Sequence, residues 1–123
     1  MKKILIVEDN EKNMKLVRDI LRHQGHATLE AVNGLDGVRL AEEEHPDLVL
    51  MDIQLPGMNG IDALGVLRKD PTTASIPVIA VTASVMQQDR KLITEAGFDG
   101  YIGKPINLKE FLSTVQQMLR GQQ

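Results

Sequence analysis

Two short runs of consecutive apolar residues place the strongest constraint on the fold of this chain. Residues 48–51 read Leu-Val-Leu-Met, and residues 78–81 read Val-Ile-Ala-Val. A strand with one face in water alternates apolar and polar side chains, whereas a strand covered on both faces is apolar throughout. The two runs therefore predict central strands of a parallel sheet with helices packed on both faces.

Strand and helix patterns alternate along the rest of the chain. We expect strands at residues 3–8, 27–30, 47–52, 77–82 and 100–102. We expect helices at residues 11–24, 34–44, 60–69 and 86–96, and a last helix after Asn107. Asn107 is a good N-cap, and Glu110 three residues later completes a capping box. The last helix carries apolar residues at helical spacing, namely Leu108, Phe111, Leu112, Val115, Met118 and Leu119.

Five strands that alternate with five helices predict a (βα)₅ doubly wound α/β fold. The usual order of such a five-stranded parallel sheet is 2-1-3-4-5, as in the flavodoxin-like fold. A chain of 123 residues fits one ordinary domain, so we expect residues 1–123 to form a single domain. Ligands of such sheets bind beyond the carboxyl ends of the strands, where strands 1 and 3 diverge.

Composition excludes several classes of function. The chain has no cysteine, which excludes disulfides, zinc–thiolate sites and iron–sulfur clusters. Its formal net charge of −3 offers no basic surface for nucleic acid. No stretch approaches the roughly 18 apolar residues of a membrane span. We therefore expect a cytoplasmic protein that binds neither nucleic acid nor a membrane.

Acidic residues stand at the carboxyl ends of two predicted strands. The first strand ends in Glu8 and Asp9, and the third ends in Asp52. Three carboxylates that converge at one edge would raise at least one pKa unless a cation lies among them. Oxygen ligands without a nearby His or Cys favour Mg²⁺ over zinc. The sequence therefore predicts a magnesium site here.

A hydroxyl and an ammonium group face these acids. Thr82 ends the fourth predicted strand, and Lys104 follows the fifth. A cation, an ammonium and a hydroxyl together suit a visiting anion, and phosphoryl transfer needs such neutralisation of charge. A carboxylate can act as the nucleophile and form an aspartyl phosphate. Taken singly, Asp9 would be a helix cap and Lys104 a solvated lysine; it is their joint placement that indicates a site.

Four segments resemble the signature of response-regulator receiver domains. In chain order they are Val7-Glu8-Asp9-Asn10, Met51-Asp52-Ile53-Gln54-Leu55-Pro56-Gly57-Met58-Asn59-Gly60, Val81-Thr82-Ala83 and Lys104-Pro105. The resemblance covers essentially the whole chain, in the right order and spacing. It implies the CheY-like receiver fold and a role as a phosphoacceptor in two-component signalling.

The resemblance also implies a role for each acid. Asp52 is expected to accept the phosphoryl group and to bind Mg²⁺ together with Asp9. Glu8 is expected to contribute through water, and the Gln54 carbonyl to complete the protein ligands. Glu8 stands where receivers often have Asp, which lengthens the side chain without threatening the chemistry.

The remaining site residues follow from the same resemblance. Lys104, Thr82 and the Ala83 backbone N–H are expected to hold the phosphoryl oxygens. The Lys104–Pro105 bond is expected to be cis, a form that is accessible before proline. By composition alone Tyr101 is core filling; in receivers an aromatic residue here turns inward when the threonine moves, so Thr82 and Tyr101 are expected to form a switch.

The expected partners are proteins. The resemblance implies a phosphoryl donor that is a sensor histidine kinase or a histidine phosphotransfer protein. The expected output is non-covalent binding of a downstream protein to the surface of residues 86–96, residues 100–102 and the last helix. We expect a monomer that, as a signalling receiver and not a turnover enzyme, catalyses only its own phosphoryl transfer and slow dephosphorylation.

Four alternatives stay open. The chain could be a receiver of a hybrid-kinase pathway, or a scaffold that acts without phosphorylation. A haloacid-dehalogenase-like phosphatase would carry a second Asp two residues after its nucleophile, where this chain has Gln54. A nucleotide- or flavin-binding module would need a glycine-rich turn at residues 8–10, where this chain has Glu8-Asp9-Asn10 with two acids.

Overall fold

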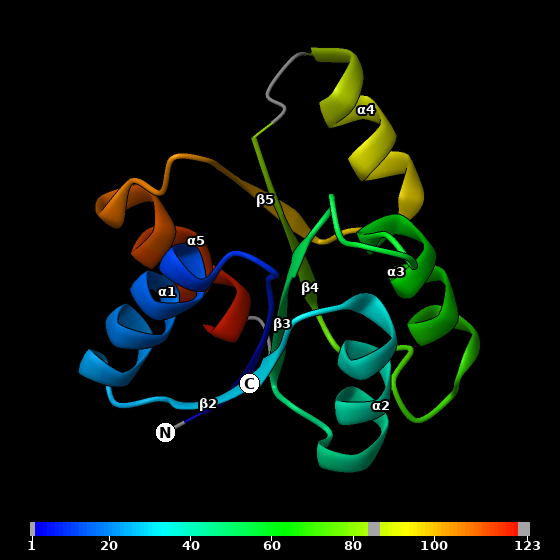
Figure 1. The fold of residues 1–123 in the computed structure, drawn as a ribbon, viewed down its shortest axis with the longest axis horizontal. Helices are drawn as coiled ribbons and strands as arrows, with labels where there is room; N and C mark the ends of the chain where they lie inside the picture. The colour runs from blue at the N-terminus through cyan, green and yellow to red at the C-terminus, as the bar shows by residue number, and fades with distance from the viewer. Residues whose placement is uncertain (1, 84–86, 121–123) are drawn as a thin grey trace.

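The computed structural model describes residues 2–83 and 87–120, in which five strands alternate with five helices (Figure 1). The strands are β1 (Lys3–Val7), β2 (Ala27–Ala31), β3 (Leu48–Asp52), β4 (Val78–Thr82) and β5 (Gly100–Gly103). The helices are α1 (Glu11–His23), α2 (Gly34–Glu44), α3 (Gly60–Lys69), α4 (Gln87–Ala96) and α5 (Leu108–Arg120). Within the described residues, no helix is both long enough and apolar enough to cross a membrane.

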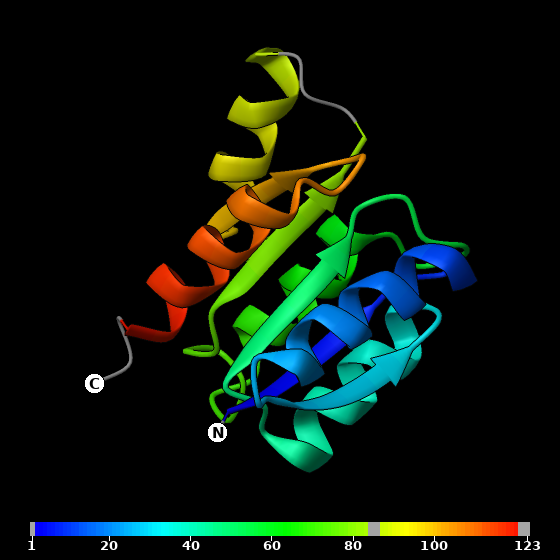
Figure 2. The same cartoon turned by 90° about the vertical axis from the view of Figure 1, so that its left-hand side faces the viewer.

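The strands form one parallel sheet in the order β2-β1-β3-β4-β5, which confirms the predicted fold. Helices α1 and α5 cover one face, and α2, α3 and α4 lie on the other (Figures 1 and 2). The chain leaves β1 for β2 on one side and later returns to β3 on the other. The carboxyl edge of the sheet therefore opens between β1 and β3.

Two apolar cores lie on opposite faces of the sheet, because successive strand residues point to opposite sides. From β1, Ile4 and Ile6 pack with Phe111 of α5, whose side chain is fully buried. Leu5 and Val7 point the other way and pack with residues of α2 and α3. All five residues of β3 and of β4 are buried, as expected for strands covered on both faces.

Asparagine side chains cap four of the helices. The Oδ1 atoms of Asn10, Asn33, Asn59 and Asn107 each accept a hydrogen bond from the backbone N–H three residues later, at 2.8–3.1 Å. Each bond satisfies a donor that the first helical turn cannot pair internally. These caps begin α1, α2, α3 and α5 directly after the loops at the carboxyl edge of the sheet. The predicted N-cap at Asn107 is confirmed.

The element ends differ slightly from those predicted. The first strand ends at Val7 and not at Glu8, and β4 begins at Val78 and not at Pro77. Proline has no N–H to donate, so Pro77 contributes only its carbonyl, which accepts from Val49 N at 3.0 Å. The helix predicted from residue 86 is seen from Gln87, since residue 86 lies outside the described residues.

Candidate functional site

Four neighbouring strands bring polar residues to one edge of the sheet. Asp52 and Thr82 are the last residues of β3 and β4, which lie side by side. Glu8 and Asp9 directly follow β1, and Lys104 directly follows β5. Because parallel strands end at the same edge, these five residues become neighbours in space although they lie far apart in the sequence.

The three predicted acids form a compact cluster. Glu8, Asp9 and Asp52 each offer a carboxylate oxygen, and these oxygens all lie within 4.8 Å of one another. Glu8 and Asp52 are each only 4% exposed, whereas Asp9 is open to solvent. Buried carboxylates at this spacing repel one another unless positive charge lies among them.

Lys104 supplies positive charge to this cluster. Its Nζ lies 2.9 Å from Glu8 Oε1 and 2.9 Å from Asp52 Oδ2. The backbone of Lys104 is tied to β4, because Lys104 N donates to Thr82 O at 2.8 Å. The Lys104–Pro105 peptide bond is cis, as predicted. The Lys104 ammonium therefore bridges the buried carboxylates of Glu8 and Asp52. With three carboxylates and one ammonium, the cluster has more negative than positive charge.

Backbone amides hold the two buried acids in place. Asp52 Oδ1 accepts from Gln54 N at 3.0 Å, and Glu8 Oε2 accepts from Asn10 N at 3.2 Å. Each carboxylate thus uses one oxygen for an amide and presents the other to Lys104. A carboxylate fixed at both oxygens is held in one orientation before any ligand arrives.

The crowding of charge changes two pKa values. Burial, together with the nearby Asp52 carboxyl, raises the pKa of Glu8 from 4.5 to about 7, against the opposing effect of Lys104. Burial acts to lower the pKa of Lys104, but hydrogen bonds and charges from Asp52 and Glu8 outweigh it and raise that pKa. When no other cation is present, Glu8 and Lys104 therefore hold their protons up to a higher pH than usual. The same excess of negative charge would attract a metal ion.

The other predicted site residues lie around this cluster. Thr82 is buried at the end of β4, and Ala83 after it is exposed. Gln54 is exposed two residues beyond Asp52, with its N–H turned to that carboxylate. Tyr101 is half-buried on β5 and packs against the core that α2, α3 and α4 cover.

Gly60 is a site residue to which the sequence motifs assigned no role. A Cβ at this position would lie 2.4 Å from Asp52 O and 2.8 Å from Ile53 Cα, and Gly60 N donates to Ile53 O at 2.9 Å. The start of α3 therefore packs directly against the backbone that carries the nucleophile candidate. The sequence feature that could have indicated this close approach is the Asn59-Gly60 pair, which directly precedes a helical pattern.

We expect Gly60→Ala to destabilise the protein by about 2 kcal/mol, because the added methyl meets backbone atoms that cannot rotate away. Gly65→Ala is the matched control: it lies within α3 and would meet nothing within 4 Å. Alanine there should stabilise the protein by up to about 1 kcal/mol. Urea unfolding of both variants checks this, and equal free energies of unfolding would contradict the close approach at Gly60.

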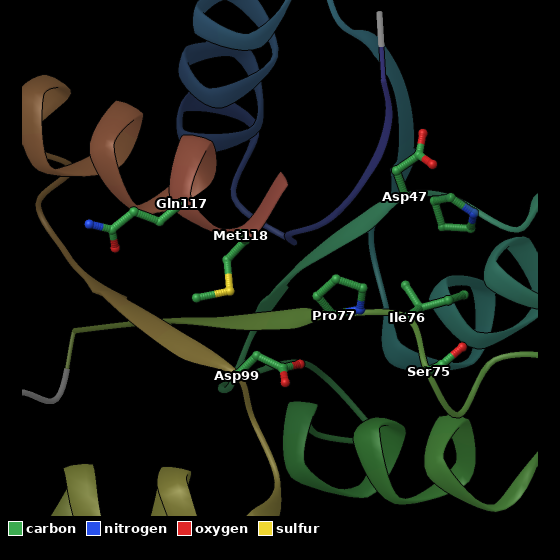
Figure 3. A pocket seen from close by; sticks show the side chains of 8 residues that line it. Asp47, Ser75, Ile76, Pro77, Asp99, Gln117 and Met118 are labelled. Carbon is green, nitrogen blue, oxygen red and sulfur yellow. The ribbon is translucent and has the colours of Figure 1, made fainter. Parts of the chain in front are cut away.

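Two hollows mark the surface of the described residues. A groove of about 380 Å³ begins at Glu8 and Asp9 and runs along α1, past Met14, toward Glu30 and Val32. A hollow of about 680 Å³ lies at the opposite, amino-terminal edge of the sheet (Figure 3). It is lined by Pro46, Asp47, Ser75, Ile76, Pro77, Asp99, Gln117 and Met118. Of the acid cluster, Glu8 and Asp9 line the first of these two hollows, and none of its members lines the second.

Comparison with known families gives the class of the protein. Residues 4–116 match the family described as response regulator receiver domain, and the chain belongs to this family. Receiver domains of this family are signalling domains of two-component systems, which agrees with the resemblance in the sequence motifs.

Among curated proteins, the chain is similar to the polar-differentiation response regulators DivK of Brucella species. It is 46% identical to that of Brucella ovis over 118 residues, which cover 96% of both chains. The DivK protein of Brucella anthropi is equally similar, at 46% identity over 96% of both chains. The chain is thus a DivK-like member of the receiver family.

Solved structures share the fold. The receiver domain of a sensor histidine kinase from Pseudomonas aeruginosa superposes with a TM-score of 0.89 at 33% identity, over 96% of this chain and 97% of that one. That crystal structure holds a magnesium ion coordinated in its active-site cleft. A response regulator from Chloroflexus aurantiacus gives a TM-score of 0.92 at 26% identity, over 97% and 98% of the two chains.

Proposed function

We propose that this chain accepts one phosphoryl group on Asp52 in a Mg²⁺-dependent reaction. The observation that carries the proposal is the arrangement of Asp52, which is buried at the end of β3 with Oδ2 2.9 Å from Lys104 Nζ and two further carboxylates beside it. A buried nucleophile among fixed charges of both signs suits an anionic substrate that arrives with a cation.

The acid cluster fits Mg²⁺ in its chemistry. Glu8, Asp9 and Asp52 offer oxygen ligands alone, which Mg²⁺ prefers, and one lysine leaves the cluster with excess negative charge. Asp9 and Asp52 would bind the ion directly, Glu8 through water, and Gln54 through its carbonyl. Bound there, Mg²⁺ would neutralise the oxygens of an incoming phosphoryl group.

The transfer step uses residues at three of the four strand ends. A carboxylate oxygen of Asp52 attacks the phosphorus of a phosphohistidine on the donor. The new O–P bond forms as the P–N bond breaks, and the imidazole nitrogen keeps the electron pair. Lys104, the Thr82 hydroxyl and the Ala83 N–H would hold the phosphoryl oxygens during the transfer.

The output of the proposed switch is a protein-binding surface. Thr82 would move toward the phosphoryl group, and Tyr101 on the neighbouring strand would turn inward. The surface of α4, β5 and α5 would then favour a downstream protein, because the phosphoryl group stabilises the active arrangement more than the inactive one. The proposed donor is a sensor histidine kinase or a histidine phosphotransfer protein, and the proposed unit is a single cytoplasmic receiver domain, residues 1–123, acting as a monomer.

A second candidate function is that of a receiver in a hybrid-kinase pathway. The similarity to the receiver domain of a Pseudomonas aeruginosa sensor histidine kinase favours it. The similarity to DivK proteins over 96% of both chains favours the stand-alone regulator. Turnover of external phosphate esters is disfavoured, because Gln54 stands where a phosphatase of the haloacid-dehalogenase type has its acid–base Asp.

The proposal is tested by intact mass after incubation with acetyl phosphate, with and without Mg²⁺. We expect one added phosphoryl group per chain in the presence of Mg²⁺ and the unmodified mass after chelation, since the attack needs the cation to offset the carboxylates. A folded protein that binds Mg²⁺ but acquires no adduct, from acetyl phosphate or from a phosphorylated histidine phosphotransfer protein, would contradict the proposal and favour a scaffold.

A further inference from the structure

Gly34, the first residue of α2, lies directly against the backbone of the connection between β3 and α3. α2 lies beside α3 on one face of the sheet (Figure 1). A Cβ at Gly34 would lie 2.5 Å from Met58 O, far closer than nonbonded atoms pack. Gly34 is buried, and its φ is not positive, so its backbone conformation does not require glycine. The lack of space between α2 and Met58 requires it.

The connection between β3 and α3, residues 53–59, is closed into a ring by hydrogen bonds. Gly60 N donates to Ile53 O at 2.9 Å, so the two ends of the connection are joined. Leu55 N also donates to Ile53 O, at 3.2 Å, and the Leu55 side chain is buried. Because both ends are fixed, a displacement of Met58 cannot be absorbed by free chain and shifts the other residues of the ring.

Gln54 belongs to this ring and connects it to the acid cluster. Its N–H donates to Asp52 Oδ1 at 3.0 Å, which fixes one oxygen of the proposed nucleophile. The Gln54 carbonyl is also a proposed ligand of Mg²⁺. Groups that orient the ligands of a metal affect its binding almost as strongly as the ligands themselves. The position of the ring therefore determines both the orientation of Asp52 and the place of a proposed metal ligand.

α2 is the firmer of the two partners at this contact. A Cβ at Gly37, one turn along the helix, would lie 2.8 Å from Val7 Cγ2, so α2 also rests closely on β1. The start of α2 is capped by Asn33, whose Oδ1 accepts from Asp36 N at 2.8 Å. Its inner face is buried, namely Gly34, Gly37, Val38 and Ala41. An irregular connection yields more easily than a helix packed in this way, so a side chain at position 34 should displace the ring.

We propose that Gly34 is a positioning residue for the Mg²⁺ site, because its lack of a side chain lets the ring lie where Gln54 contacts Asp52. None of the three clustered acids lies on α2, so α2 contributes to the site only through the position of the ring. The inference rests on the proposed function for its metal. The effect of Gly34 on the ring does not depend on that function.

Gly34→Ala separates this role from ordinary helix stability. Alanine is the better helix former, so at an open position in a helix it stabilises the protein. At position 34 the added methyl meets Met58 O, so we expect this variant to be less stable and to bind Mg²⁺ more weakly. Gly65→Ala is the matched control, because its methyl meets nothing within 4 Å. Val115→Ala controls for a general loss of stability, since it removes buried volume from α5 on the other face of the sheet.

Hydrogen exchange of the metal-free protein, followed by NMR, tests the ring without any cation. In Gly34→Ala we expect the amides of Gln54 and Gly60 to exchange about tenfold faster or more than in the wild type, because their hydrogen bonds depend on the ring. Gly65→Ala should leave both rates unchanged, and Val115→Ala should raise them no more than rates elsewhere in the chain. Unchanged rates in Gly34→Ala, or an equal rise throughout its chain, would overturn the inference.

Titration with Mg²⁺, followed by the amide resonance of Gln54, then tests the metal site. We expect the Kd to rise by about tenfold or more in Gly34→Ala and to keep its wild-type value in both controls. A wild-type Kd in folded Gly34→Ala would overturn the inference.

The wild type decides the question if Gly34→Ala does not fold. Mg²⁺ should shift the amide resonance of Gly34 with the same Kd as that of Gln54 and leave that of Gly65 in place. A Gly34 resonance that does not respond would overturn the inference. A wild type that binds no Mg²⁺ would contradict the proposed function, and the exchange rates of the metal-free protein would still decide whether Gly34 positions the ring.

Discussion

Asp52→Asn is expected to abolish the Mg²⁺-dependent phosphoryl adduct while the protein stays folded. The substitution keeps the size of the side chain and one oxygen that can accept from Gln54 N, but it removes the nucleophilic carboxylate. It also removes one of three crowded negative charges, which should leave the free energy of unfolding equal or higher. Intact mass after acetyl phosphate should match the unmodified chain.

Asp62→Asn is the matched control for this result. Asp62 is an exposed carboxylate in the first turn of α3, ten residues along the chain from Asp52 and outside the acid cluster. The control should acquire one phosphoryl group as the wild type does. An adduct that persists in Asp52→Asn would contradict the proposed role of Asp52. It would indicate that Glu8 or Asp9, the two other carboxylates of the cluster, is the nucleophile.

The position of Asp52 was predictable because it depends on chain topology alone. Four continuous apolar residues before it required a strand buried on both faces, and a parallel sheet requires that such strands end together. From the sequence alone, the same reasoning predicts that Glu8, Asp9, Thr82 and Lys104 lie at one edge of the sheet. Residues far apart in sequence are predictable neighbours when regular secondary structure places them.

Details that depend on side-chain packing were not predictable in this way. The sequence placed Lys104 near the acids but did not show that its Nζ would bridge Glu8 and Asp52 at equal distances. The contacts of Arg68 were not anticipated: in two irregular connections, its guanidinium donates to three backbone carbonyls and one carboxylate, those of Ala74, Ile76, Gly97 and Asp99. Backbone carbonyls carry no signature in a sequence, so their partners emerge only from the folded chain.

The raised pKa of Glu8 leads to the second large effect, a loss of stability with rising pH in the metal-free protein. The folded-state pKa is about 7, against 4.5 for an unperturbed glutamate. Between these values the folded protein holds a proton at Glu8 that the unfolded chain has released, so the free energy of unfolding falls as the pH rises. At about 1.4 kcal/mol per pKa unit, the loss approaches about 3 kcal/mol once the pH passes the folded-state pKa.

Glu8→Gln should remove most of this slope, because the amide does not titrate. Glu43→Gln, an exposed glutamate on α2, is the matched control and should keep the slope of the wild type. Urea unfolding between about pH 5 and pH 8 measures the difference, which cancels contributions from groups common to all three proteins. Parallel slopes for Glu8→Gln and wild type would show that Glu8 does not carry the proton.

Magnesium distinguishes a functional cation site from a merely strained acid cluster. If the cluster holds Mg²⁺, the ion replaces the proton on Glu8, so saturating Mg²⁺ should stabilise the wild type more at pH 8 than at pH 5 and flatten its slope. Glu8→Gln should retain part of this stabilisation through Asp9 and Asp52, whose carboxylates remain. Equal stabilisation by Mg²⁺ at both pH values would mean that the ion and the proton do not compete, and that Mg²⁺ binds away from Glu8. A pH-dependent gain that survives in Glu43→Gln and shrinks in Glu8→Gln would instead identify the proton at Glu8 as the occupant that Mg²⁺ displaces.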